Sequence, residues 1–125
     1  MSKLFIGIAA FIHLYIFVIE SILWGRPRTN KVFGMTAEQA ELNRLFAFNQ
    51  GFYNLFLAIA AIAGIGLTLQ GFPTIGATLM IYAAASMLGA SVVLFFSQRR
   101  LIRPVLIQGL PPLLGLVSLG CKLFL

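Results

Sequence analysis

Charged residues are scarce in this chain of 125 residues, at 10% of the composition, and acids are the scarcest, with three against nine lysines and arginines. A soluble domain usually carries about 25% charged residues. Apolar residues make up 60% of the chain and the mean hydropathy is +0.98, too apolar for one soluble core of this length. The composition therefore indicates a single multi-span membrane domain over residues 1–125.

Cysteine and histidine are nearly absent, with one residue of each, Cys121 and His13. One cysteine cannot form an internal disulfide, and we expect it to be a small apolar residue of the last helix. One histidine and one carboxylate in the same span are too few for a recognisable metal site, so no metal is expected. The chain also lacks a Ser-His-Asp pattern and a phosphate-binding glycine loop, so neither a catalytic residue nor a cofactor can be assigned from the sequence.

Four apolar runs are long enough to cross a bilayer as helices. They cover about residues 4–24, 45–69, 74–97 and 104–125. The pattern predicts an all-α integral membrane four-helix bundle, with the lipid bilayer as its surroundings.

Basic residues divide unevenly between the two ends of this bundle. The segments 25–44 and 98–103 carry seven of the nine lysines and arginines, and the opposite end carries Lys3 and Lys122. Loops rich in Lys and Arg remain in the cytoplasm. We therefore expect both segments in the cytoplasm, both termini on the non-cytoplasmic side, and a multi-pass protein of the bacterial cytoplasmic membrane. Topology thus accounts for the net charge of +6 without nucleic acid as a partner.

The segment 25–44 is the only long connection. Gly, Pro and Asn residues in its first part predict irregular chain. Thr36 and Gln39 then match a capping box, which predicts a helix that starts outside the membrane. Glu41 and Arg44, spaced i, i+3, can pair across the surface of that helix.

The second span opens with a polar stretch, residues 49–54. On a helix, Asn49, Gln50, Tyr53 and Asn54 fall within an arc of about 140°. Polar side chains in hydrocarbon normally face protein or water. We therefore expect this wedge to face the bundle and the other helices to pack around it.

The first span carries two ionisable residues, His13 and Glu20. With Phe17 and Trp24 they recur at i, i+4, i+7 and i+11, which places all four on one helical stripe. Gln108 lies about one turn inside the fourth span.

Two further patterns concern helix shape and packing. Pro111 and Pro112 are expected to kink the fourth span and to free nearby backbone carbonyls. A packing seam is expected on the third span, at Tyr82, Ser86, Gly89 and Val93.

Three helices thus bring polar groups to similar depths, and two explanations stay open. One is a hydrogen-bonded cluster that holds the bundle together. The other is a pocket near the cytoplasmic face for a small anionic or amphiphilic molecule. The residues expected to bind such a ligand are His13, Glu20, Trp24, Arg44, Asn49, Gln50, Tyr53, Asn54 and Gln108.

The first-helix pattern H-x6-E-x3-W followed by NQG-x-YN resembles an uncharacterised bacterial family of four-span membrane proteins, domain of unknown function 1304. The resemblance covers nearly the whole chain and implies the same topology, with no known activity or substrate.

Three other functions stay open beside ligand binding. Glu41-x-x-Arg44-x-x-x-x-Asn49 is similar to the second-helix motif of the MAPEG family of glutathione and eicosanoid metabolism, which has an acid where this chain has Phe52. A glutamate in the first of four spans also resembles small multidrug transporters, which would make Glu20 a proton-coupled site. A structural subunit is the last alternative, and homo-oligomerisation is left open.

Overall fold

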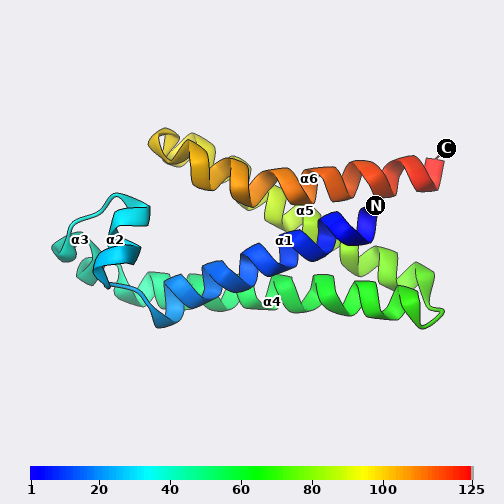
Figure 1. Cartoon of the computed structure of the whole chain (residues 1–125), viewed down its shortest axis with the longest axis horizontal. Coiled ribbons are helices and arrows are strands. Elements are labelled where there is room, and N and C mark those ends of the chain that lie inside the picture. Colours follow the sequence, from blue (N-terminus) through cyan, green and yellow to red (C-terminus); the bar gives the residue numbers. More distant parts are fainter. Residues whose placement is uncertain (125) are drawn as a thin grey trace.

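The computed structural model describes residues 1–124 and is a bundle of four long helices (Figure 1). The elements are α1 (Ser2–Phe17), the π-helical turn η1 (Val18–Ile22), α2 (Pro27–Phe33), α3 (Ala37–Leu42), α4 (Arg44–Leu69), α5 (Pro73–Ser97), the 3₁₀ turn η2 (Arg99–Leu101) and α6 (Ile102–Phe124). Four helical stretches are long and apolar enough to cross a membrane: α1 with η1, α4, α5, and η2 with α6. The predicted all-α four-helix membrane bundle is confirmed.

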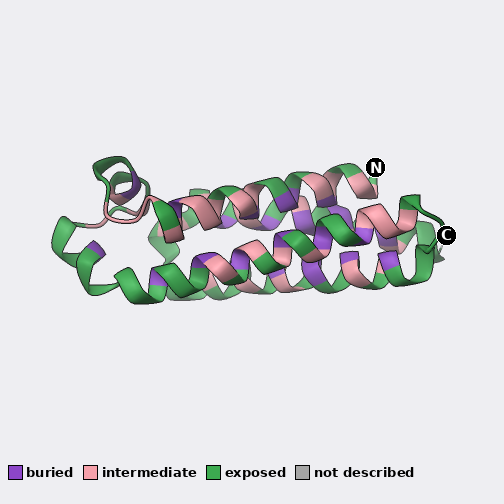
Figure 2. Ribbon diagram, turned by 90° about the horizontal axis from the view of Figure 1, so that it is seen from below, coloured by how far each residue is buried: buried purple, intermediate pink, exposed green. Residues whose placement is uncertain are grey.

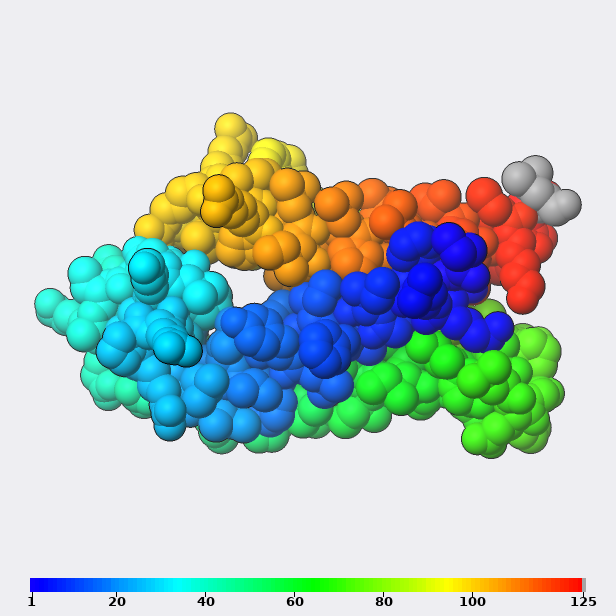
Figure 3. Space-filling view, in the orientation of Figure 1, coloured from blue at the N-terminus to red at the C-terminus, as the bar shows by residue number. Residues whose placement is uncertain are grey.

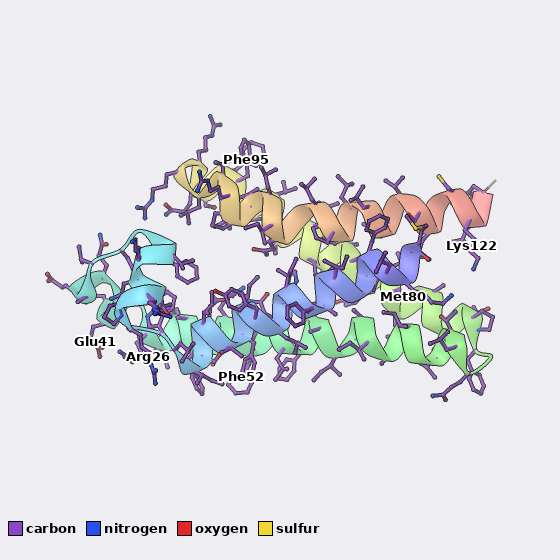
Figure 4. The ribbon with its side chains drawn as sticks, viewed as in Figure 1. Arg26, Glu41, Phe52, Met80, Phe95 and Lys122 are labelled. Atoms are coloured by element: carbon purple, nitrogen blue, oxygen red, sulfur yellow. The ribbon has the colours of Figure 1, made fainter. Side chains whose placement is uncertain are left out.

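The two ends of the bundle differ. The start of α1, the end of α6 and the α4–α5 turn lie at one end, whereas α2, α3 and the α5–α6 turn lie at the other, which we call the basic end (Figure 1). Figure 4 shows Arg26 and Glu41 at the basic end and Lys122 at the opposite one. Charged side chains thus gather where a bilayer-spanning bundle would meet water.

The outer surface of the bundle is apolar. Buried residues follow the inward faces of the long helices, and exposed residues cover the outside (Figure 2). Large exposed side chains include Phe11, Phe56, Ile62, Tyr82 and Leu106. Such a surface is abnormal for a soluble monomer and is what the lipid-facing side of a membrane bundle requires.

The core is built from small residues and lies mainly in the half away from the basic end. Its buried members are Ile6, Ala9, Ala10, Ala58, Ala61, Met80, Ala83, Ala84, Met87 and Leu119. Glycines let the helices approach closely there. A Cβ on Gly64 would lie 2.8 Å from the carbonyl oxygen of Gly76, and one on Gly115 would lie 2.5 Å from Ile6 Cδ1.

Two serine–glycine contacts join helices in the half nearer the basic end. Ser21 Oγ donates to the carbonyl oxygen of Phe48 over 2.8 Å, and it lies where a Cβ on Gly51 would have to be. This contact ties the end of η1 to α4. Ser91 Oγ likewise donates to the Val105 carbonyl oxygen over 2.8 Å and fills the space beside Gly109, which ties α5 to α6.

The packing seam expected on α5 is wrong. Tyr82 and Val93 are 68% and 64% exposed, and nothing lies within 4 Å of a Cβ placed on Gly89. The buried face of α5 consists of Gly76, Met80, Ala83, Ala84, Met87 and Ser91. Small residues occur on both faces of this helix, so their presence on one face did not identify the packed side.

The segment between the first two spans is more ordered than expected. Its first part forms α2, because Pro27 occupies the first helical turn, where it is tolerated. Gly34, at φ 61°, ends the helix in the left-handed conformation. The predicted capping box is present: Gln39 N donates to Thr36 Oγ1 over 3.1 Å, and Thr36 N donates to Gln39 Oε1 over 2.9 Å.

Candidate functional site

A cavity of about 510 Å³ lies among the four long helices in the half nearer the basic end. Residues of α1, η1, α4, α5 and α6 form its walls, and α2 covers it at the basic end. Figure 3 shows the hollow between α2, α1 and the first turns of α6. We call it the interhelical cavity; its volume falls within the range of about 300–1,000 Å³ typical of small-molecule sites.

Most of the wall of the interhelical cavity is apolar. Ile12, Ile16 and Ile19 contribute one side from α1 and η1, and the α2 side chains of Val32 and Phe33 contribute the cover. The outer edge includes Tyr15 on α1 and Ile107 on α6, whose side chains are 54% and 58% exposed. The cavity therefore opens between α1 and α6 toward the lipid-facing surface.

A hydrogen-bonded pair, Glu20 and Asn54, lies in the wall of this cavity. Asn54 Nδ2 donates to Glu20 Oε1 over 2.8 Å and also to the Gln50 carbonyl oxygen of its own helix over 3.1 Å. Both hydrogens of the Asn54 amide are therefore used, while its Oδ1 accepts no hydrogen bond from residues 1–124. The second carboxyl oxygen of Glu20 likewise has no donor within this range.

Two glutamines and Ser97 extend the polar part of the wall. The side chains of Gln50 and Gln108 line the cavity, and neither forms a hydrogen bond with the part of the chain that the structure describes. Pro111 and Pro112 stand inside α6 without an N–H group. The carbonyls of Ile107 and Gln108 thereby lose their usual helical donors, and both residues line the cavity.

The π-helical turn η1 contains Glu20 and changes the direction of the chain after it. Leu23 N donates to the Val18 carbonyl oxygen over 2.9 Å, an i to i+5 bond. Such a turn adds a residue to the helical repeat and is frequent at functional sites. Trp24 therefore leaves the stripe that a continuous helix would give it, and the expected alignment with His13 is wrong.

Trp24 instead holds the helices of the basic end in place. Its Nε1 donates to the Ala40 carbonyl oxygen over 2.7 Å, and its ring lies 5.2 Å from that of Phe33. A second hollow of about 470 Å³, the interfacial groove, runs past Trp24. Its lining consists of Glu20, Ser21, Trp24, Glu41, Leu42, Arg44, Leu45 and Phe48.

Arg44 belongs to this groove and not to the interhelical cavity. Its Nε donates to Glu41 Oε2 over 2.9 Å, as the spacing predicts, and its Nη1 donates to the Trp24 carbonyl oxygen over 3.3 Å. The guanidinium also occupies the space beside Gly25, whose φ is 86°. Arg44 thus fixes the junction between η1 and α2.

Three predicted site residues lie outside both hollows. His13 is fully buried, and its Nδ1 donates to the Ala9 carbonyl oxygen over 2.8 Å. Asn49 is exposed and bonds only the Leu45 carbonyl oxygen of its own helix among residues 1–124. Tyr53 is 64% exposed.

The expectation that the whole polar wedge faces the bundle is therefore wrong for Asn49 and Tyr53. The close contact with Ser21 shows that Gly51 faces η1, and Asn49 lies about 200° away from Gly51 on the helix. Asn54, three residues beyond Gly51, is the one buried polar side chain of the wedge, at 5% exposure.

Sequence reasoning missed the apolar part of the site. The α2 residues that cover the cavity, Val32 and Phe33, lie in a segment whose sequence predicts irregular chain, although two adjacent apolar residues in a basic segment are a usable signal. The serines of the serine–glycine contacts gave no signal, because a serine in a span can as easily bond its own helix.

The geometry defines a small multi-pass membrane protein whose four helices enclose an amphipathic cavity. The chain belongs to the family described as "Protein of unknown function (DUF1304)", whose sequence profile matches residues 7–120. The resemblance drawn from the first-helix and NQG-x-YN patterns is thus confirmed. Neither curated proteins nor solved structures contain a match to this chain.

Proposed function

We propose that this protein binds an amphiphilic molecule that partitions into the membrane, and that the binding site is the interhelical cavity. The observation that carries the proposal is the state of Gln50 and Gln108. Polar residues that only hold a membrane bundle together bond one another or the backbone. The half-buried amide of Gln108 and the exposed amide of Gln50 instead border an open volume without partners among residues 1–124.

The shape of the cavity supports a ligand with a polar head and an apolar chain. The polar groups of Glu20, Asn54 and Gln108 come from three helices and converge on one volume. The apolar wall continues to the opening between α1 and α6, where exposed Tyr15 and Ile107 border the lipid-facing surface. A chain extending through this opening would remain in an apolar environment, which favours entry from the bilayer.

The alternative functions receive less support from the contacts. In a glutathione enzyme of the MAPEG kind Arg44 and Asn49 would face the substrate, but Arg44 pairs with Glu41 and Asn49 bonds its own helix outside the cavity. Transport would need a second conformation open at the other end, and the cavity supports only its binding step. A purely structural subunit would leave the volume beside Gln50 and Gln108 unexplained.

We further propose that the basic end faces the cytoplasm of a bacterial cell. The support is the concentration of lysine and arginine in the segments 25–44 and 98–103. The cavity then lies in the cytoplasmic half of the membrane.

Filling the cavity tests the binding function. Ala90 on α5 lines the cavity, whereas Ala85 on the same helix is exposed on the outside. We expect Ala90→Phe to weaken binding of dodecanol by roughly tenfold or more, equal to about 1.4 kcal/mol, and the matched control Ala85→Phe to leave it unchanged.

Competition with a photoreactive dodecanol analogue in phosphatidylcholine nanodiscs measures this binding, and peptide mapping locates the label. Label that dodecanol displaces should map to the α1 and α6 peptides that contain Tyr15 and Ile107. Equal displaceable labelling of the two folded variants would contradict the proposal.

A further inference from the structure

The interhelical cavity contains one acid and no cation. Glu20 is its only charged side chain, and no lysine, arginine or histidine of residues 1–124 lines it. On the groove side, Glu20 faces Glu41 and Arg44, and the Arg44 guanidinium is already bonded to Glu41 and to the Trp24 carbonyl oxygen. The expected anionic ligand would therefore meet a carboxylate without a counter-charge.

The polar part of the wall contains free hydrogen-bond acceptors beside the charge of Glu20. Glu20 Oε2 and Asn54 Oδ1 accept no hydrogen bond from residues 1–124. The Asn54 amide donates its two hydrogens to Glu20 Oε1 and to the Gln50 carbonyl oxygen. The side-chain amides of Gln50 and Gln108 add both donors and acceptors. Because a neutral amide can present either its N–H group or its oxygen, the fixed demand of this wall comes from Glu20, whose free oxygen needs a donor.

We infer that the ligand head group is a primary ammonium carried on an apolar chain, and that Glu20 is its counter-ion. The inference rests on the proposed binding function and specifies its ligand class. An ammonium supplies three N–H donors and one positive charge. Charge-assisted hydrogen bonds to a carboxylate are roughly twice as strong as neutral ones, and a buried cation needs such a partner. An alcohol supplies one donor and no charge, and a carboxylate supplies repulsion.

Four amphiphiles with the same chain separate these head groups: dodecylamine, dodecanol, dodecanoate and dodecyltrimethylammonium. Their affinities are measured by the same competition experiment in phosphatidylcholine nanodiscs near pH 7. We expect dodecylamine to bind at least tenfold more tightly than dodecanol. Dodecyltrimethylammonium should bind more weakly than dodecylamine, because it has the charge without an N–H donor. Dodecanoate should bind most weakly.

Glu20→Gln should abolish the preference for dodecylamine while dodecanol still binds. The matched control is Glu38→Gln, since Glu38 is an exposed acid on α3 outside both hollows. This control should keep the full preference, which excludes a general surface effect of removing one acid.

The outcomes distinguish the two proposals. If dodecanol or dodecanoate binds wild type as tightly as dodecylamine does, and Ala90→Phe abolishes all binding, the binding function stands and the ammonium inference is overturned. A dodecylamine preference that survives in Glu20→Gln overturns the inference as well. If Ala90→Phe and Ala85→Phe bind every compound equally, the binding function fails, and the inference fails with it.

Discussion

Gly51→Ala is the substitution whose effect the structure specifies most closely. The added Cβ would overlap Ser21 Oγ and lie 3.0 Å from Ser21 Cβ, so the serine must rotate or the helices must separate. Overpacking of this kind costs about 1–3 kcal/mol. Loss of the bond from Ser21 to the Phe48 carbonyl oxygen adds about 0.6 kcal/mol, the average for such bonds between membrane helices. Alanine regains about 0.5–1 kcal/mol of helix propensity, so we expect a net loss of roughly 1–3 kcal/mol.

Reversible unfolding in mixed micelles, with increasing SDS and the helical circular dichroism as signal, measures this loss. Gly66→Ala is the matched control in the same helix, because nothing lies within 4 Å of its Cβ. It should be neutral or stabilising by up to about 1 kcal/mol.

A double-mutant cycle with Ser21→Ala then identifies the cause. Removing Oγ relieves the worst overlap, so Gly51→Ala should cost less in that background than in wild type. Equal costs in the two backgrounds, or equal effects of Gly51→Ala and Gly66→Ala, would refute the assignment of Gly51 to the contact between η1 and α4.

Two further predictions concern His13 and the orientation of the chain. Because His13 Nδ1 donates to the Ala9 carbonyl oxygen, its buried Nε2 is an acceptor without a partner among residues 1–124, which costs about 1–3 kcal/mol. His13→Leu should therefore leave stability in the SDS titration unchanged or raise it, and a marked loss would reveal a partner for Nε2. Arg28 is exposed on α2, so Arg28→Cys in a Cys121→Ser background should react with an impermeant maleimide only after cells are permeabilised, and labelling of intact cells would reverse the proposed orientation.

The sequence predicted the helices well, because hydrocarbon imposes strong rules on composition, length and charge placement. The capping box and the Glu41–Arg44 pair were also predictable, since each depends on residues three apart. The sequence did not show which faces of α4 and α5 are buried. Gly51 decides which side of α4 is buried, and it does so through Ser21, a residue 30 positions away in the sequence.

The π-helical turn was a second limit of the sequence. Val18–Ile22 departs from an ordinary apolar helix only at Glu20 and Ser21, so a continuous 3.6-residue repeat was the natural expectation. With this turn the first span ends at Ile22, and Trp24 lies in the turn after it and contacts the helices of the basic end instead of continuing the stripe of His13.

The positions of the glycine contacts have a mechanical consequence. Within the pairs α1–α4 and α5–α6, the serine–glycine contacts lie nearer the basic end, whereas the glycine contacts between the pairs, Gly64 with Gly76 and Ile6 with Gly115, lie nearer the opposite end. The two helix pairs therefore approach each other closely at the opposite end, and the interhelical cavity lies between them nearer the basic end.

At the basic end, an exposed hydrogen bond of 3.1 Å runs from Arg100 Nη1 in η2 to the carbonyl oxygen of Gly34, which follows α2. An exposed bond of this kind stabilises little. A small rotation of one helix pair against the other would therefore change the width of the cavity while the alanine-rich core keeps its contacts. Ligands with chains of different thickness would then fit without repacking of that core.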